Sequence, residues 1–163
     1  MNVRLDTYFK LWFFRYLVGL IAFIFVIWAI SPWYAITFNS NHSIEGYLFL
    51  LEKNKIPKKG ELVAFWPPDN PYYQHTWFVK YVYGVGGDYV EVENRNFYIN
   101  RRLVGKAKEK TLKGDPLELG PTGKIPEHYF FVATPHMDSY DSRYKDIGWI
   151  PEDRIIGRTV RLF

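Results

Sequence analysis

The sequence FVKYVYGVGGD, from Phe78 to Asp88, decides the expected fold. Its first half is rich in aromatic and β-branched residues and has no glycine or proline before Gly84, which is typical of a β-strand. Lys80 interrupts this apolar run, where an ammonium group loses its water unless an anion pairs with it. Burial without an anion favours the neutral amine, which is a base. The alternative is that Lys80 lies on an edge strand and extends its charged head into solvent.

A glycine-rich turn follows this strand. Gly84, Gly86 and Gly87 tolerate positive φ, and Asp88 is a residue that turns favour. Other apolar or alternating segments predict strands at 47–51, 61–66, 89–92, 97–99, 103–104, 128–133 and 155–160. Because Glu93 to Asn96 is a turn sequence between two of these segments, we expect a β-hairpin there.

The sequence after residue 36 carries no sustained helical period, so we expect residues 37–163 to form one mainly β domain of antiparallel strands. Within this domain, residues 105–127 are rich in lysine, glycine and proline and show weak periodicity. Such a composition is typical of a loop. We therefore expect a long mobile insertion at about 105–127.

Residues 1–36 predict a cytoplasmic tip and a transmembrane anchor helix. From Leu11 to Ile30 the sequence is apolar except for Arg15, and about 20 helical residues span roughly 30 Å, enough to cross a bilayer. Positive charge before the span predicts a cytoplasmic N-terminus and an extracytoplasmic domain. The alternative is a cleaved signal peptide, because Ala29-Ile30-Ser31 offers small residues. The length of the apolar run and Pro32, directly after such a cut, favour a retained anchor.

Composition excludes several kinds of site. The chain of 163 residues contains no cysteine, so disulfides, thiolate metal sites and a thiol nucleophile are excluded. The net charge of +4 is spread along the chain and forms no basic stripe on one helix, so we expect no nucleic-acid partner. His136 and Asp138 have no third ligand at a suitable spacing, and we expect neither a metal nor a cofactor.

Three elements that carry chemistry follow one another along the chain. Ser43 lies in a polar segment just after the predicted membrane span, Lys80 lies in the apolar strand, and Ser139-Tyr140-Asp141-Ser142-Arg143 precedes Gly148-Trp149-Ile150-Pro151. Together with Gly60-Glu61-Leu62-Val63-Ala64-Phe65, they resemble the bacterial type I signal peptidase family. The resemblance is closer to its conjugative-transfer branch, the TraF-like peptidases that mature pilins. It implies a signal-peptidase-like β-domain and a serine endopeptidase with a Ser–Lys dyad.

The sequence departs from the family pattern at several positions. Ile44, Glu45 and Gly46 stand where the family has methionine and proline after the nucleophile. The segment 133–136, Ala-Thr-Pro-His, replaces the Gly-Asp-Asn-Arg run of housekeeping signal peptidases. These departures favour the specialised branch over general secretion. Asn41 occupies the position where the family has a hydroxyl residue that binds the oxyanion.

The resemblance and the chemistry assign roles to these residues. Ser43 Oγ is the predicted nucleophile, and Lys80, kept neutral, is the predicted general base. The side-chain amide of Asn41 and the backbone N–H of Ser43 are predicted to bind the oxyanion. Ser139 is predicted to orient the amine by a hydrogen bond.

The rest of the Ser-x-Asp-Ser-Arg box has a supporting role. Asp141 and Arg143 are predicted to form an ion pair, and Ser142 lies between them in the same box. An ion pair of this kind holds a loop in place and takes no proton from the substrate.

Two alternative catalytic assignments remain. Ser40 is a rival nucleophile, although Ser43 directly precedes the predicted strand. His42 and His136 suggest a Ser–His–Asp triad, but both lie in polar segments where a solvated loop histidine is the simpler interpretation.

The expected function is cleavage of exported precursors, such as prepilins, on the outer side of the bacterial inner membrane within a conjugation or type IV secretion system. The expected partners are the protein substrate and the lipid bilayer. One alternative is a general type I signal peptidase. An alternative from a different class of function is a membrane-anchored, non-catalytic β-scaffold of a secretion machine.

Overall fold

A computed structural model describes residues 3–38, 44–69 and 76–163. Its elements in chain order are α1 (Val3–Ile30), β1 (Tyr34–Phe38), β2 (Leu48–Lys53), β3 (Leu62–Phe65), β4 (Phe78–Val85), β5 (Tyr89–Glu93), β6 (Asn96–Ile99), β7 (Arg102–Lys106), β8 (Gly123–Lys124), β9 (Tyr129–Ala133), β10 (Ile150–Pro151), a 3-10 helix (Glu152–Arg154) and β11 (Ile155–Arg161). The chain divides into two compact units, Met1–Tyr34 and Ala35–Phe163. The mainly β fold class with one N-terminal apolar helix is thus confirmed.

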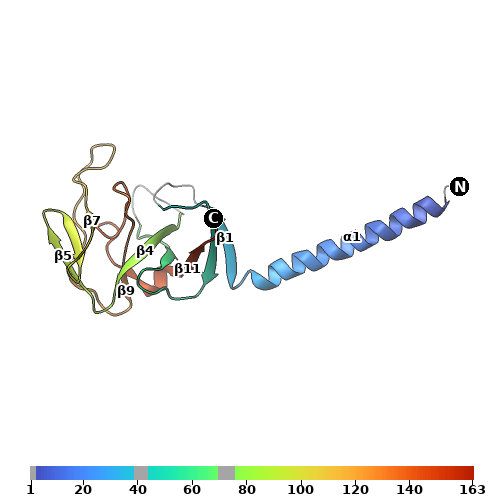
Figure 1. Ribbon diagram of the computed structural model, residues 1–163, viewed down its shortest axis with the longest axis horizontal. Coiled ribbons are helices and arrows are strands. Elements are labelled where there is room, and N and C mark those ends of the chain that lie inside the picture. Colours follow the sequence, from blue (N-terminus) through green and yellow to red (C-terminus); the bar gives the residue numbers. More distant parts are fainter. Residues whose placement is uncertain (1–2, 39–43, 70–75) are drawn as a thin grey trace. The chain divides into compact units, whose positions relative to one another are not determined.

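The first unit is essentially the helix α1, drawn as one uninterrupted helix in Figure 1. It begins at Val3, eight residues before the predicted apolar span, and its segment Tyr8–Ile30 is long and apolar enough to cross a membrane. That segment is not buried against the rest of the chain. The helix ends at Ile30 because Pro32 disfavours helical geometry in the residue before it and has no N–H to donate.

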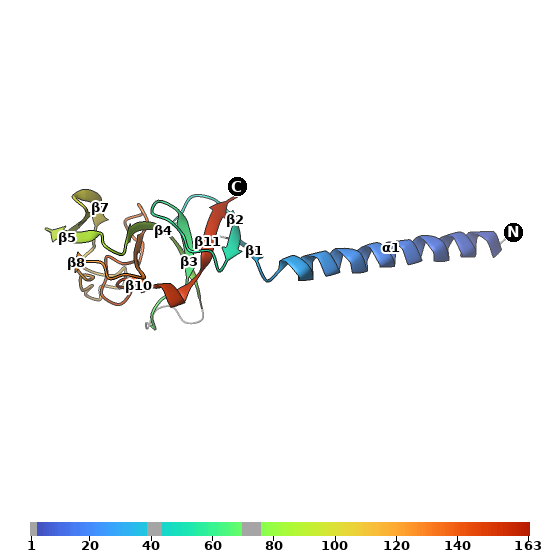
Figure 2. The ribbon, with the colours of Figure 1, turned by 90° about the horizontal axis from the view of Figure 1, so that it is seen from below.

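The second unit contains a seven-stranded sheet with the order β1-β2-β11-β3-β4-β9-β10. The pairings β2–β11, β11–β3, β3–β4, β4–β9 and β9–β10 are antiparallel, as predicted. A smaller sheet has the order β7-β6-β5-β8. Figures 1 and 2 both place this small sheet beyond β4 and β9, at the end of the unit away from β2 and β11.

The small sheet is built from two tight hairpins. β5 and β6 pair from Glu93–Asn96 onward, with Asn94 and Arg95 at φ of 49° and 66° between them. β6 and β7 repeat this turn, with Asn100 and Arg101 at φ of 48° and 67°. Two consecutive residues with positive φ form the turn whose twist matches paired strands, and asparagine tolerates that conformation. The hairpin predicted at residues 93–96 is present.

The predicted strands lie within two residues of the observed ones, but three strands were missed. β1 begins within the aromatic segment that follows the span, and β8 and β10 have only two residues each. Such short pairings depend on a neighbouring strand rather than on a local pattern, because two residues carry no alternation. Gly84 was predicted in a turn and lies inside β4 instead, and among the three glycines only Gly87 has positive φ, at +92°.

The strand β4 changes partners along its length. Residues 78–81 pair with β3, residues 81–85 pair with β9, and a bulge lies between Val82 and Gly84. Gly84 leaves room in this bulged stretch for Ile125, whose Cδ1 would lie 2.7 Å from a Cβ at residue 84 and would have to shift. β9 ends at Ala133, opposite Tyr81. Among the described residues, the Phe78–Lys80 edge therefore has a strand neighbour only on the β3 side.

Apolar side chains pack on both faces of the large sheet. One face carries Val63, Phe65, Phe78, Val82, Phe130, Val132, Ile147 and Ile150. The other face carries Phe131 and Ala133, packed with the small sheet, and Leu62, packed with Ile44 and Phe49. Alternation along each strand distributes consecutive side chains between these two cores.

The segment 105–127, predicted as an insertion, packs on the domain at several points. Ala107 and Ile125 are buried, and the Arg95 side chain donates hydrogen bonds to the carbonyls of Ala107 at 3.1 Å and Leu117 at 2.9 Å. Leu119 forms a bridge with Tyr144. The predicted mobility of this segment stays a prediction.

Candidate active site

Lys80 lies at the centre of the candidate site, on the face of β4 that also carries Phe78 and Val82. Its side chain is only 6% exposed, and its Nζ lies 5.6 Å from the centroid of the Phe78 ring. Nζ donates a hydrogen bond of 2.9 Å to Ser139 Oγ. The residue that interrupts the apolar pattern is therefore buried, and its amine is held by a hydroxyl rather than hydrated on a strand edge.

The electrostatic environment of Lys80 favours its neutral form. Its pKa is lowered from 10.5 to about 8, chiefly because burial removes the water that would stabilise the ammonium ion. The Asp141 carboxylate acts in the opposite direction and the Arg143 guanidinium in the same direction as burial. Because these two charges are paired with each other, they present little net charge to Lys80. A substantial fraction of the amine is therefore available as a base near pH 8.

Ser139 comes from the loop that follows β9. The residue is 3% exposed, and its backbone N–H donates to the His136 carbonyl at 3.2 Å. This turn directs the Ser139 hydroxyl at Lys80 across 59 positions of sequence. The structure thus brings together two of the predicted site residues, one from a strand and one from a loop.

A buried bidentate ion pair holds this loop. Arg143 donates from Nε to one oxygen of Asp141 and from Nη2 to the other, both at 2.8 Å. Asp141 is fully buried and Arg143 is 1% exposed. The paired geometry satisfies both carboxylate oxygens, which is the condition under which a buried ion pair is tolerated.

Arg143 also organises backbone carbonyls, which the sequence did not reveal. Its guanidinium donates to the carbonyls of Lys106 at 3.1 Å, His136 at 3.2 Å, and Thr134 and Ser139 at 3.4 Å. One side chain therefore connects β7 to the start and the middle of the loop that carries Ser139. Planar guanidinium groups suit this role because they present five donors in fixed directions.

Ser142 fastens the loop to β9. Its backbone N–H donates to the Val132 carbonyl, and its Oγ accepts from the Val132 N–H, both at 2.9 Å. These two bonds continue the edge of β9 beyond its pairing with β10. The residue is fully buried, so its hydroxyl completes a backbone pairing and does not face substrate.

The predicted nucleophile Ser43, its rival Ser40 and the predicted oxyanion residue Asn41 lie outside the described residues. Ile44, which follows Ser43 in sequence, is 6% exposed and belongs to a cluster with Phe49 and Leu62. Val79 and Tyr81 pack against this cluster. Ile44 therefore belongs to a cluster that packs against the two residues flanking Lys80 in β4.

The described histidines do not form the alternative triad. His136 is exposed, and its Nδ1 accepts from the backbone N–H of Asp138 at 3.1 Å. The Asp138 carboxylate pairs with Lys108 instead. His42 lies outside the described residues. Within residues 3–38, 44–69 and 76–163, no group of three histidines and acidic residues is placed to hold a metal.

Sequence comparison identifies relatives of this chain. The family model described as "Signal peptidase, peptidase S26" matches residues 8–163. A probable signal peptidase I-2 of Synechocystis sp. is 31% identical over 105 residues, 63% of this chain and 46% of that protein. The signal peptidase I of Helicobacter pylori is 32% identical over 104 residues, 63% of this chain and 30% of that protein. The aligned part thus spans less than half of either curated relative.

Among solved structures, a signal peptidase I from Enterococcus faecalis is 24% identical, with a TM-score of 0.44, over 64% of this chain and 97% of the solved one. The family match covers the apolar helix, the strand that carries Lys80 and the loop that carries Ser139. On the strength of that match over nearly its whole length, the chain belongs to the signal peptidase family S26.

Proposed function

We propose that this chain is a membrane-anchored serine endopeptidase that uses Ser43 and Lys80 as a dyad. The observation that carries the proposal is the buried Lys80 amine, with its pKa near 8 and its hydrogen bond to Ser139. An amine with a pKa near 8 has a neutral fraction of about a tenth at pH 7, and this neutral form can remove the proton of a serine hydroxyl. The membership of the chain in the signal peptidase family supports the same reaction class.

In this mechanism, Lys80 Nζ takes the proton of Ser43 Oγ as that oxygen attacks the scissile carbonyl. The resulting ammonium then protonates the leaving amine, and an ester between Ser43 and the substrate remains. Water, deprotonated by the neutral Lys80, hydrolyses this ester and regenerates the serine. Ser139 holds the Lys80 amine in one direction throughout, and Asp141 and Arg143 hold the loop that presents Ser139.

The negative oxygen of the tetrahedral intermediate needs donors that are already in place. We assign these to the Ser43 N–H and the Asn41 side-chain amide. Removal of one such donor typically costs about 100-fold to 1000-fold in kcat.

The proposed substrates are exported precursors such as prepilins, cut on the outer side of the bacterial inner membrane within a conjugation system. The departures at Ile44–Gly46 and 133–136 favour this specialised branch. The positive charges before the helix favour a cytoplasmic N-terminus and a periplasmic catalytic domain. A general signal peptidase is the second candidate, favoured by the curated relatives.

The test is processing of exported proteins in cells that carry Ser43→Ala, Ser40→Ala or Lys80→Ala in place of the wild type. Mass spectrometry of pilins and other exported proteins reads the mature N-termini. We expect Ser43→Ala and Lys80→Ala to abolish processing and Ser40→Ala to preserve it. Accumulation of prepilin alone supports the specialised branch, whereas accumulation of many precursors supports general secretion.

A scaffold function makes the opposite prediction. If both Ser43→Ala and Lys80→Ala accumulate to wild-type levels and processing is unchanged, the endopeptidase proposal is overturned. The chain then acts as a membrane-anchored β-module, and its loss affects assembly of a secretion machine without affecting cleavage.

A further inference from the structure

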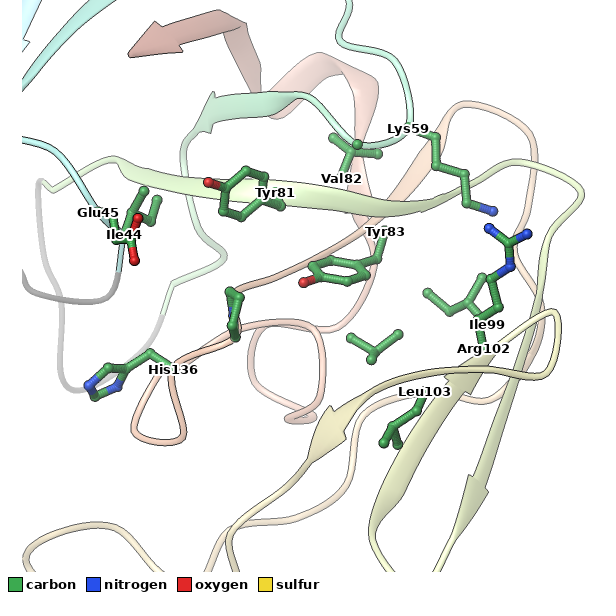
Figure 3. A pocket seen from close by; sticks show the side chains of 13 residues that line it. Ile44, Glu45, Lys59, Tyr81, Val82, Tyr83, Ile99, Arg102, Leu103 and His136 are labelled. Carbon is green, nitrogen blue, oxygen red and sulfur yellow. The ribbon is translucent and has the colours of Figure 1, made fainter. Parts of the chain in front are cut away.

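A groove of about 810 Å³ lies between the large sheet and the β6–β7 hairpin (Figure 3). Its walls come from β4, from the hairpin, from the start of the loop after β9 and from the segments after Ser43 and before β3. The lining residues that matter here are Ile44, Tyr81, Tyr83, Arg102, Leu103 and His136.

The middle of the groove is apolar and aromatic. Tyr81 and Tyr83 extend into it from β4, and Leu103 from β7 forms the opposite wall (Figure 3). Leu103 is 61% exposed although it lies in a strand. Broad aromatic surfaces opposite an exposed aliphatic side chain suit the apolar side chains of an extended peptide.

One end of the groove is cationic. Figure 3 shows the Lys59 and Arg102 side chains pointing toward one another, at the end away from Ile44 and Glu45. Lys59 pairs with Asp88 at 2.8 Å, which largely neutralises it. No ion pair of Arg102 is found among the described residues, so its guanidinium remains available for an external carboxylate. A cationic end of this kind indicates that the molecule bound in the groove carries an acidic side chain.

The groove is lined by sequence neighbours of the candidate active-site residues, although Lys80 itself faces the other side of β4. Ile44 is the residue after Ser43, and Tyr81 is the residue after Lys80. Pro135 and His136 come from the loop that carries Ser139. Because Ile44 directly follows Ser43, a peptide whose scissile bond lies at Ser43 has this groove as an adjoining surface.

We propose that the groove binds an extended segment of the peptide substrate, on one side of the scissile bond. Apolar side chains of that segment rest on Tyr81, Tyr83 and Leu103, and an acidic side chain pairs with Arg102. This inference rests on the proposed function and adds a selectivity determinant to it. From Lys80 to Gly84, β4 advances four residues, or about 13 Å at roughly 3.3 Å per residue. Because Arg102 pairs with Ile99 and the Ile99 side chain lies beside Gly84, the acidic residue is placed about four residues from the bond.

The test uses the full-length chain in detergent and internally quenched peptides with small residues before the scissile bond. Glutamate, glutamine or lysine is placed at each position from two to seven residues from the bond, on either side. We expect glutamate to lower KM about threefold to fivefold relative to glutamine at one position only, with kcat unchanged, which is the range of a solvent-exposed ion pair. The side on which this position occurs assigns the direction of the bound peptide.

Arg102→Glu is the informative variant, and Arg101→Glu is its matched control. Arg101 is the neighbouring residue in the same turn, is exposed and does not line the groove. Arg102→Glu should reverse the preference from glutamate to lysine at that position, whereas Arg101→Glu should retain the preference for glutamate. Leu103→Ser should raise KM for peptides with apolar residues between the bond and that position. Thermal unfolding of each variant verifies its fold.

The outcomes separate this inference from the proposed function. If the wild type cleaves the peptides and Ser43→Ala does not, but no position discriminates between the three side chains, the groove assignment is overturned and the peptidase stands. Equal effects of Arg101→Glu and Arg102→Glu also overturn it, because they show a diffuse charge effect. If the wild type cleaves none of the peptides, the proposed function is overturned, and the groove assignment with it.

Discussion

At the residue scale, the protonation state of Lys80 is the central feature of this protein. Its side chain is 6% exposed, and the nearby Asp141 carboxylate is paired with Arg143. Desolvation therefore outweighs the attraction of Asp141, and the pKa falls to about 8. A single buried amine is converted from a permanent cation into a base by the loss of its water.

The first prediction concerns the pH dependence of cleavage. The active form has neutral Lys80, so kcat/KM should rise about tenfold per pH unit below pH 8 and level off above it, because the pKa is about 8. Initial rates on a quenched peptide between pH 6 and pH 10 measure this. A profile that is flat through pH 8, or that falls there, contradicts the assignment of Lys80 as the base.

The second prediction concerns stability. Below pH 8 the folded protein carries a buried ammonium, and a shift from 10.5 to about 8 corresponds to about 3 kcal/mol. Lys80→Met should therefore be inactive and yet more stable than the wild type at pH 7. Between pH 8 and 10.5 only the unfolded wild-type chain binds the proton, so wild-type stability rises with pH and the difference narrows.

Equilibrium unfolding of the detergent-solubilised chain at pH 7 and pH 10 measures this difference. Lys80→Arg is the control, because arginine keeps its charge at both pH values and should be less stable than the wild type at pH 10, where the folded wild type has a neutral amine. If Lys80→Met is less stable than the wild type at pH 7, the buried ammonium does not destabilise the folded protein, and the prediction is wrong.

At the element scale, the loop from residue 134 to residue 144 positions Ser139 against β4. Ser142 fastens it to β9 through two hydrogen bonds with Val132, and Arg143 donates to carbonyls at its start and its middle. Tyr140 and Tyr144 add apolar contacts, since both pack against the cores of the domain. The Ser142 and Arg143 side chains therefore fix the position of Ser139, whereas burial lowers the pKa of Lys80.

The third prediction follows from this loop. Arg143→Met leaves the Asp141 carboxylate buried without its cation, which should lower the free energy of unfolding by about 3–5 kcal/mol. The unpaired carboxylate attracts the proton of Lys80 more strongly, so the midpoint of the pH–rate profile should move upward from pH 8. Asp141→Leu with Arg143→Met should remove the unpaired charge and recover part of the stability. If Arg143→Met is less stable than the wild type but the midpoint of its pH–rate profile stays at pH 8, the Asp141–Arg143 ion pair has only a structural role.

At the scale of the whole molecule, the chain consists of an apolar helix and a β unit with two sheets. The side chains of Tyr8–Ile30 are not buried by the rest of the chain, so their apolar surface needs another environment. A lipid bilayer supplies it over this length. The family membership and the helix together indicate a membrane-anchored protein.

The fourth prediction concerns the anchor. The full-length chain should remain with membranes after extraction at alkaline pH, because a spanning helix is not released by removal of charge interactions. Cleavage of precursors embedded in proteoliposomes should fall at least about tenfold when a soluble helix replaces residues 8–30, because the two partners lose their shared membrane. Release of the unaltered chain into the supernatant would contradict the anchor.

Local patterns were sufficient for the strands and the helix. The alternation in residues 78–83 and the apolar run that ends at Ile30 are each visible within one element. The two-residue strands β8 and β10 were missed because their pairing depends on distant partners. The sequence predicts a turn at Gly84, but in the structure this glycine leaves room for the Ile125 side chain beside a bulge. That contact forms only after the two sheets have packed, so no local pattern reveals it.

The sequence by itself determined the helix long enough for a bilayer, the β class of the following unit and the order of the candidate residues, because these depend on composition and on local alternation. Only the tertiary structure decided that Lys80 is buried with a lowered pKa, that Ser139 accepts its hydrogen bond and that Arg143 donates to the loop carbonyls. Only it formed the groove beneath Tyr81 and Tyr83. The physical reason is that hydration and contact depend on what surrounds a side chain, and those surroundings come from strands and loops distant in sequence.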